Sequence, residues 1–98
     1  MVKPLTEIQP LLIQSGEIIL YPNPANTNIT VQLPETVEDD SDILIHDMMG
    51  ILKLSTVIPA FEISEDINIE SLPQGVYIVS IIRNGFLQKS ISLLVIRN

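Results

Sequence analysis

The sequence predicts an all-β fold, a sandwich of about seven short antiparallel strands in two sheets. Short segments rich in β-branched residues alternate with turn signals, and no stretch repeats its apolar residues at the period of an amphipathic helix. Apolar and polar residues alternate most clearly over Asn28 to Leu33. Tyr77 follows the turn glycine Gly75 at the start of a strand, which fits the tyrosine corner of immunoglobulin-like sandwiches. The predicted fold is therefore an immunoglobulin-like β-sandwich.

Length and composition limit the chain to one domain. A chain of 98 residues buries roughly 60 to 70% of its unfolded surface, which gives a modest core. No segment approaches the run of about 18 apolar residues that a membrane-spanning helix needs. Without cysteine there is no disulfide, thiol nucleophile or thiolate metal site.

The net charge of −7 argues against a nucleic-acid partner, because affinity for phosphate comes from clustered Lys and Arg. The charge is uneven along the chain. Met1 to Glu70 carries 12 acids and 2 bases, whereas Ser71 to Asn98 carries 3 bases and no acid. The final segment is therefore expected to be weakly basic beside an acidic body.

Residues 1–16 are predicted to be a linker from an upstream domain, and residues 17–98 to be the folded domain. Prolines and Gly16 surround the short apolar run Leu11 to Ile13, for which an added edge strand is the less favoured alternative. No apolar core of a secretory signal precedes the first strand. If the protein is exported, the chain is therefore expected to be a fragment of a longer precursor.

Four strands are predicted in the first sixty residues. They are Glu17–Tyr21, Asn28–Leu33, Ile43–Asp47 and Ile51–Ile58. Structural turns are assigned to Pro22, Asn23 and Pro24 after the first strand, and to a type I turn that ends at Gly50. The acidic segment Glu35 to Asp42 is expected to be a loop.

Three further strands complete the sandwich. Phe61 to Glu70 is predicted to be half-buried, with a possible bulge at Glu65 and with Phe61, Ile63, Ile67 and Ile69 on one face. Asn84-Gly85 is a strong signal for a type I′ hairpin turn. This turn joins the predicted strands Val76 to Arg83 and Phe86 to Ile96.

The last strand is apolar on both faces near its end. Ile91, Leu93 and Val95 alternate with Leu94 and Ile96, so the end of the strand can be buried on both sides. An apolar strand at a free sheet edge favours pairing. We therefore expect a partner protein to bind this hairpin by strand addition or by docking on its exposed apolar face. The alternative is that this face packs on the linker.

The residues show no catalytic constellation. His46 is the only histidine, and it lacks a nucleophile or an orienting partner, so a structural role is predicted. The loop Glu38 to Asp42 could bind a hard cation, but it lacks the spacing of a calcium loop and is expected to be solvated. The four aromatic residues are expected to be taken up by the core, which argues against a sugar-stacking platform. No enzyme activity, cofactor, metal or small-molecule substrate is predicted.

Four motifs in order resemble the type A C-terminal sorting domain of the type IX secretion system. They are Tyr21-Pro22-Asn23-Pro24-Ala25, Ile45-His46-Asp47 with Gly50, Leu72-Pro73-Gln74-Gly75-Val76-Tyr77, and Gly85 with Lys89 and an apolar end. The resemblance covers about Ile18 to Asn98. His46 stands where an aromatic residue is frequent in that family, and the chain ends on Arg97-Asn98 where many members end on lysine.

The resemblance implies a non-catalytic export signal that carries cargo from the periplasm across the outer membrane, to the cell surface or the medium. Its implied partners are the translocon, a sortase-like protease that cuts in or before residues 1–16, and the upstream cargo domain. The implied recognition residues are Gly75, Tyr77, Gly85, Lys89, Ile91, Leu93 and Val95. An isolated domain is expected to be able to dimerise through its free strand.

The alternative is a fibronectin-like or immunoglobulin-like spacer or adhesion module of a cell-surface protein. This class shares the sandwich and the tyrosine corner, so the fold alone does not separate the two. A sorting signal must stand at the extreme C-terminus of its precursor, whereas a spacer can be followed by further domains.

Overall fold

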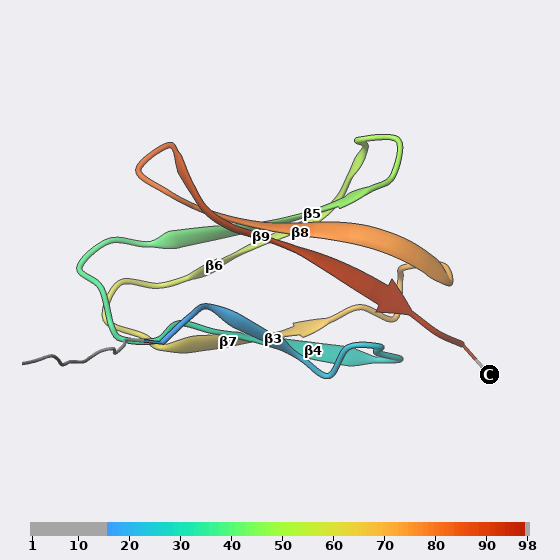
Figure 1. Ribbon diagram of the computed structural model, residues 1–98, viewed down its shortest axis with the longest axis horizontal. Helices are drawn as coiled ribbons and strands as arrows, with labels where there is room; N and C mark the ends of the chain where they lie inside the picture. Colours follow the sequence, from blue (N-terminus) through green and yellow to red (C-terminus); the bar gives the residue numbers. More distant parts are fainter. Residues whose placement is uncertain (1–15, 98) are drawn as a thin grey trace, which may run out of the picture.

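The computed structural model describes residues 16–97 of the chain. These residues form seven strands in two sheets that lie face to face, with no helix among them (Figure 1). The strands are β3 (Ile19–Tyr21), β4 (Asn28–Gln32), β5 (Ser41–Asp47), β6 (Leu52–Ile58), β7 (Ser64–Asn68), β8 (Gly75–Arg83) and β9 (Phe86–Val95). The prediction of an all-β sandwich of antiparallel strands is confirmed.

The strands are divided unequally between the two sheets. One sheet has three strands in the order β3-β4-β7, and the other has four in the order β6-β5-β8-β9. All neighbouring strands are antiparallel. The longest pairing joins β8 to β9, from Gly75 opposite Val95 to Arg83 opposite Phe86. The final hairpin therefore forms half of the larger sheet, and β9 is one of its edge strands.

The core lies between the sheets and consists of aliphatic residues at alternate positions along the strands. Its fully buried members of this kind are Ile29, Val31, Leu33, Ile43, Ile45, Ile58, Ile69, Val79, Ile81, Leu93 and Val95. Full burial of such a side chain contributes about 1.5 to 3 kcal/mol. Both strands of the final hairpin supply such residues, so the hairpin is part of the core and not an appendage.

The predicted tight turns are present. Asn84 and Gly85 both have positive φ, at 54° and 81°, as a type I′ hairpin requires. In the turn between β5 and β6, the N–H of Gly50 donates to the carbonyl of Asp47 at 3.0 Å, and the φ of Gly50 is 85°. Both turns use residues that accept left-handed backbone at low cost.

The predicted strand Phe61 to Glu70 is wrong at both ends, because β7 covers only Ser64–Asn68. The N–H of Glu62 donates to the carbonyl of Pro59 at 3.0 Å, which forms a turn in place of a strand. Phe61 has a φ of 69°, and its side chain is 68% exposed instead of buried. The bulge proposed at Glu65 is absent, since this residue pairs in continuous register with Val31.

Register shifts occur instead within the larger sheet. One lies between Ile45 and His46 in the pairing of β5 with β6, and the other between Ile81 and Ile82 in the pairing of β8 with β9. Each shift changes which residues of the partner strand share a face.

The remaining differences concern strand boundaries and aromatic residues; β4 ends at Gln32 and not at Leu33, and β9 ends at Val95 and not at Ile96. The first described strand begins at Ile19 and not at Glu17, and β5 begins at the buried Ser41 and not at Ile43. The run 11–13, considered as an extra edge strand, lies outside the described residues. Three of the four aromatic side chains are exposed, which contradicts the expectation that the core takes them up. Only Tyr77 is buried among them.

Candidate recognition surface

Most residues that the resemblance assigns to recognition lie inside the sandwich. Leu93 and Val95 are fully buried, Tyr77 is 4% exposed, and Ile91 packs against the core from β9. Gly75 begins β8. These residues hold the β8–β9 hairpin on the core, so little of their side chains is open to a partner.

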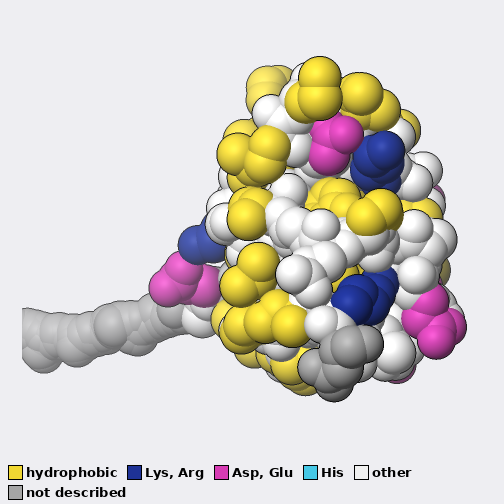
Figure 2. All heavy atoms as spheres, turned by 90° about the vertical axis from the view of Figure 1, so that its right-hand side faces the viewer, with side chains coloured by type: hydrophobic (Ala, Val, Ile, Leu, Met, Phe, Trp, Pro, Cys, Tyr) yellow, Lys and Arg dark blue, Asp and Glu magenta, His cyan; other side chains and the backbone are white. Residues whose placement is uncertain are grey.

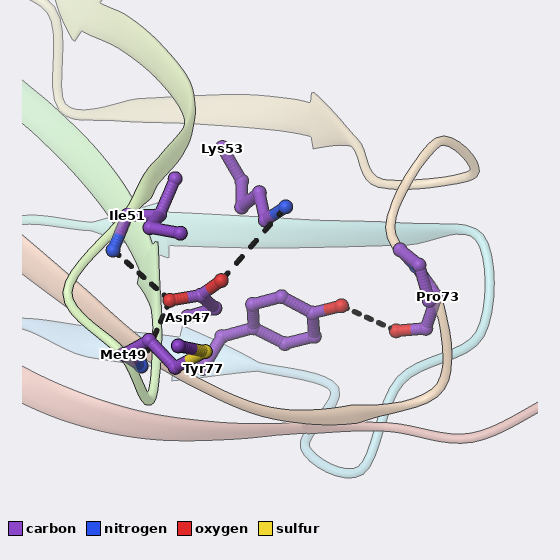
Figure 3. A network of polar contacts seen from close by, with 6 residues as sticks. All are labelled: Asp47, Met49, Ile51, Lys53, Pro73 and Tyr77. Carbon is purple, nitrogen blue, oxygen red and sulfur yellow. Dashed lines mark hydrogen bonds and ion pairs between the residues drawn. The ribbon is translucent and has the colours of Figure 1, made fainter.

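Tyr77 forms the predicted tyrosine corner. Its ring is buried on the inner side of β8, and its hydroxyl donates to the backbone carbonyl of Pro73 at 2.5 Å (Figure 3). This bond fastens the loop before β8 to the strand that it enters. The loop residue Leu72 is itself 3% exposed, so this connection is packed as well as bonded.

The turn between β5 and β6 is organised by Asp47. One carboxylate oxygen accepts from the N–H groups of Met49 and Ile51, each at 2.9 Å, and the other lies 3.8 Å from Nζ of Lys53 (Figure 3). The N–H of Ile51 is the main cause that lowers the pKa of Asp47. Desolvation is the next largest effect and opposes it, while the N–H of Met49 and the Lys53 charge lower the pKa further. The carboxylate is therefore held in its charged form by the turn.

The Pro22-Asn23-Pro24 segment lies along the outer edge of β9. The side-chain amide of Asn23 donates to the carbonyl of Ser92 at 2.7 Å, and its oxygen accepts from the N–H of Leu94 at 3.0 Å. Ala25 continues the contact as an isolated parallel bridge to Val95. The end of β9 is therefore not a free edge, contrary to expectation.

The free part of that edge lies closer to the β8–β9 turn. The N–H of Ala25 donates to the carbonyl of Leu94 at 2.9 Å, and the carbonyl of Ala25 accepts from the N–H of Ile96 at 2.8 Å. Ala25 therefore covers the outer edge of β9 to the end of the strand. Within residues 16–97, no strand lies along the edge between Phe86 and Ser90. On β9, this is therefore the stretch whose backbone is open to strand addition.

Arg97 fastens the chain after β9 to the rest of the domain. Its guanidinium donates to the backbone carbonyls of Asn26, Ile69 and Leu72, the last two at 2.8 and 2.6 Å. Its own N–H donates to Oε1 of Gln74 at 2.9 Å. The planar guanidinium of arginine can donate to several acceptors at once. The charged group of Arg97 is therefore bound to backbone carbonyls of the domain itself.

Lys89 is also paired within the chain. Its Nζ lies 2.7 Å from Oε1 of Glu17, just before β3, and this hydrogen-bonded ion pair lowers the pKa of Glu17. The pair joins the edge strands of the two sheets on the same side of the sandwich. Exposed pairs of this kind contribute little to stability, so this one marks where the chain enters the domain without holding it firmly.

Two carboxylates of the acidic loop have partners at the same end of the sandwich. Asp39 accepts from Nδ2 of Asn84 at 3.0 Å, and Asp40 accepts from the N–H of Ala60 at 2.9 Å. The loop therefore bonds to the β8–β9 turn and to the β6–β7 connection. No group of three or more His, Cys, Asp or Glu side chains that could hold a metal occurs among the described residues.

The outer face of the four-stranded sheet is apolar, with side chains that are half-buried or exposed. We define the outer face by its eight apolar side chains: Leu44, Leu52, Val57, Val76, Ile78, Ile82, Leu87 and Leu94. His46 lies half-buried on this face near the β5–β6 turn, opposite Leu52 on one side and Ile78 on the other. The expectation that the end of β9 is buried on both sides is wrong, since Leu94 is 39% exposed.

The turn between β5 and β6 extends this apolar surface. Met48, Met49 and Ile51 are exposed there, at 66%, 85% and 52%. Figure 2 shows hydrophobic side chains gathered at the top of this end of the molecule, where the four-stranded sheet and the β5–β6 turn lie. Alternation within each strand predicts which side chains point outward. Only the pairing of β6, β5, β8 and β9 shows that these side chains form one surface.

The other outer face is mostly polar. On the three-stranded sheet, Thr30 donates to Asp66 at 2.7 Å, and Tyr21 donates to Gln32 at 3.0 Å, both across paired strands. Polar side chains there satisfy one another. The two sheets therefore present chemically different surfaces to solvent.

These features define an immunoglobulin-like β-sandwich with a tyrosine corner, a C-terminal hairpin built into the core and an exposed apolar outer face. No helix in the described part of the chain is long and apolar enough to cross a membrane. A family model described as the secretion system C-terminal sorting domain matches residues 19–96. The chain belongs to this family, the C-terminal sorting domains of the type IX secretion system. No curated protein matches the chain.

Proposed function

We propose that residues 17–98 are the signal that carries an upstream cargo domain through the type IX translocon, and that residues 1–16 link the two. The match of residues 19–96 to the sorting-domain family is the observation that carries this proposal. Export across the outer membrane follows from the family.

The cargo passes through the periplasm attached to the folded domain and reaches the cell surface or the medium. There a sortase-like protease cuts in or before residues 1–16 and separates the cargo from its signal. The domain has no bond chemistry of its own in this scheme. Its contribution is a stable shape that the translocon recognises.

Recognition centres on the β8–β9 hairpin and involves residues that act in two ways. Gly75, Tyr77, Gly85, Ile91, Leu93 and Val95 set the conformation and position of the hairpin, and Lys89 marks the entry of the chain. The burial of Tyr77, Leu93 and Val95 supports a positioning role for these three over direct contact with the translocon. The cover of β9 by Asn23 and Ala25 favours docking on a face over strand addition at the end of the strand.

The test is a fluorescent protein with a periplasmic export signal, fused to residues 1–98 and expressed in a bacterium that uses type IX secretion. We expect the fluorescent protein at the surface or in the medium, and in the periplasm when the domain is left out or the translocon is deleted. Mass spectrometry of the exported protein then locates the cut. Retention of the complete fusion in the periplasm of the wild-type host would refute the proposal and leave the spacer or adhesion module as the better explanation.

A further inference from the structure

We infer that the outer face of the four-stranded sheet is the docking surface for an uncharged, aliphatic protein surface of the secretion machinery. This inference rests on the proposed function. The side chains that bind the partner then lie on the outer side of the strands, whereas Tyr77, Leu93 and Val95 lie on the inner side.

The outer face has the composition of a contact surface and not of a solvated one. Cross-strand pairs place Val76 beside Leu94, Ile78 beside His46 and Ile82 beside Leu87. The remaining positions between them are mostly serines, and no hydrogen bond within the described residues joins one side chain of this face to another. Contiguous exposed apolar residues of this kind mark interaction sites.

Charge argues against a second copy of the chain as the partner. The face carries a single carboxylate, Asp42, although the whole chain has a net charge of −7. Pairing two copies through their outer faces would bring two acidic bodies together, which costs free energy. The same net charge disfavours an anionic membrane surface. A partner protein with an apolar surface and a neutral or basic rim meets neither obstacle.

Area argues for a transient contact. Strands lie about 4.8 Å apart and advance about 3.3 Å per residue, so a face four strands wide and about seven residues long covers roughly 400 Å². A stable interface uses about 800 Å² from each partner. A contact of half that size suits a signal that must be released after transport, whereas it is small for a lasting dimer.

The position of the face fits the same role. The hairpin β8–β9 contributes half of the strands that form it, and the β5–β6 turn adds the exposed Met48 and Met49 at one end. Methionine side chains are flexible and adapt to differently shaped apolar partners. The buried residues of the hairpin then hold Val76, Ile78 and Leu94 in place from the other side of the strands.

The experiment places a charge on the outer face without touching the core. In the fluorescent fusion, Val76→Lys with Leu94→Lys changes two exposed residues of the hairpin, and Leu52→Lys alone changes an exposed residue of β6. Ile19→Lys is the matched control, since Ile19 is 46% exposed on the opposite, polar sheet. Thermal melting of each purified chain verifies that the variants fold.

We expect the hairpin variant to lower the exported fraction by roughly tenfold or more, because an unpaired ammonium buried in an apolar contact is costly. Leu52→Lys should lower it as well, and Ile19→Lys should leave it near wild type. Wild-type export by folded outer-face variants would overturn the inference while the proposed function stands, and so would an equal loss in Ile19→Lys. Absence of export by the unmodified fusion would instead refute the proposed function.

Sedimentation of the purified chain tests whether a second copy of the chain occupies the outer face instead. We expect a monomer at micromolar concentration for the wild-type chain and for the hairpin variant. A wild-type dimer that Leu94→Lys dissociates would assign the outer face to a second copy and overturn the inference.

Discussion

The side-chain amide of Asn23 pairs with the backbone of Leu94 as another strand would. Its oxygen accepts from the N–H of Leu94 at 3.0 Å while its nitrogen donates to the carbonyl of Ser92 at 2.7 Å. One residue of the loop after β3 thus satisfies one donor and one acceptor on the outer edge of β9. The flanking prolines have no N–H to offer such an edge, so the asparagine side chain supplies the donor.

Asn23→Ala should therefore destabilise the domain by about 1 to 2 kcal/mol, since two hydrogen bonds of ordinary strength are lost. Asn23→Asp should cost at least as much, because the carboxylate cannot donate to the Ser92 carbonyl and would face it with a negative charge. Urea unfolding monitored by circular dichroism measures both. Wild-type stability for Asn23→Ala would show that solvent replaces these bonds without loss.

Removal of the Tyr77 hydroxyl tests the tyrosine corner. Tyr77→Phe keeps the buried ring and deletes the bond to the carbonyl of Pro73, so we expect a loss of about 1 kcal/mol and a melting temperature lower by roughly 4 to 8 °C. Tyr21→Phe is the control, because its hydroxyl bonds only to an exposed Gln32 side chain. Equal melting temperatures for the two variants would contradict a structural role for the corner.

Two neighbours on β9 test which of its faces belongs to the core. Leu93 is fully buried, whereas Leu94 is 39% exposed. Leu93→Ala should cost about 2 to 5 kcal/mol through lost burial and a cavity. Leu94→Ala should cost well under 1 kcal/mol, as an exposed truncation does. Chemical unfolding of both variants is the measurement, and a reversed order would mean that the strand is in the opposite register.

This contrast also separates stability from recognition. Leu93→Ala should reduce export because less of the signal is folded, and export should recover at lower temperature as the folded fraction rises. Leu94→Lys should reduce export at all temperatures at which the domain is folded. Measuring exported fraction against folded fraction for both variants distinguishes the two causes.

The sequence predicted those parts of the fold whose signals are local. The Asn84-Gly85 hairpin turn, the Asp47 to Gly50 turn and the Tyr77 corner each depend on backbone preferences or contacts within a few residues. Alternation also predicted the two faces of β4. Such signals are strong because the residue types that meet these requirements are few.

Alternation misled the prediction between Pro59 and Ile63. Phe61 and Ile63 continue the apolar period of the strand that follows, but the turn closed by the Pro59 carbonyl takes the backbone out of the sheet. The N–H of Phe61 then bonds to the carbonyl of Val37 at 2.8 Å, in the loop before β5. A contact between segments so far apart in the chain has no signature in a local pattern.

The candidate surface shows the same limit. The resemblance identified residues that build the hairpin, whereas the exposed outer face depends on the register of four strands and on two register shifts. A shift of one residue in any pairing would exchange its inner and outer side chains. The bonds of Asn23 and Arg97 to distant backbone likewise follow from the assembled sandwich.

The role of Arg97 is tested by keeping its charge and changing its shape. Arg97→Lys retains a cation but has no planar fork for the carbonyls of Ile69 and Leu72, so we expect a loss of about 1 kcal/mol or more. Lys53→Ala, which removes an exposed charge from the start of β6, is the control and should have a small effect. Wild-type stability and export for Arg97→Lys would mean that the charge alone matters at this position.

The pH dependence of stability should report on Asp47. Because hydrogen bonds from the turn lower its pKa in the folded state, the unfolded chain binds a proton at higher pH than the folded chain does. The charged carboxylate therefore stabilises the fold fully above its unfolded pKa of about 4, and this contribution is lost as the pH falls through the lower folded pKa. Glu17, whose pKa Lys89 lowers, adds to the same trend.

Asp47→Asn isolates the contribution of Asp47, since the amide oxygen can still accept from Met49 and Ile51 but does not titrate. We expect this variant to melt below wild type at pH 6 and the two melting temperatures to converge as the pH is lowered toward 2. Asp47→Ala, which also loses the acceptor, should remain below both at every pH. Parallel curves for wild type and Asp47→Asn would show that the charge of Asp47 does not stabilise the turn.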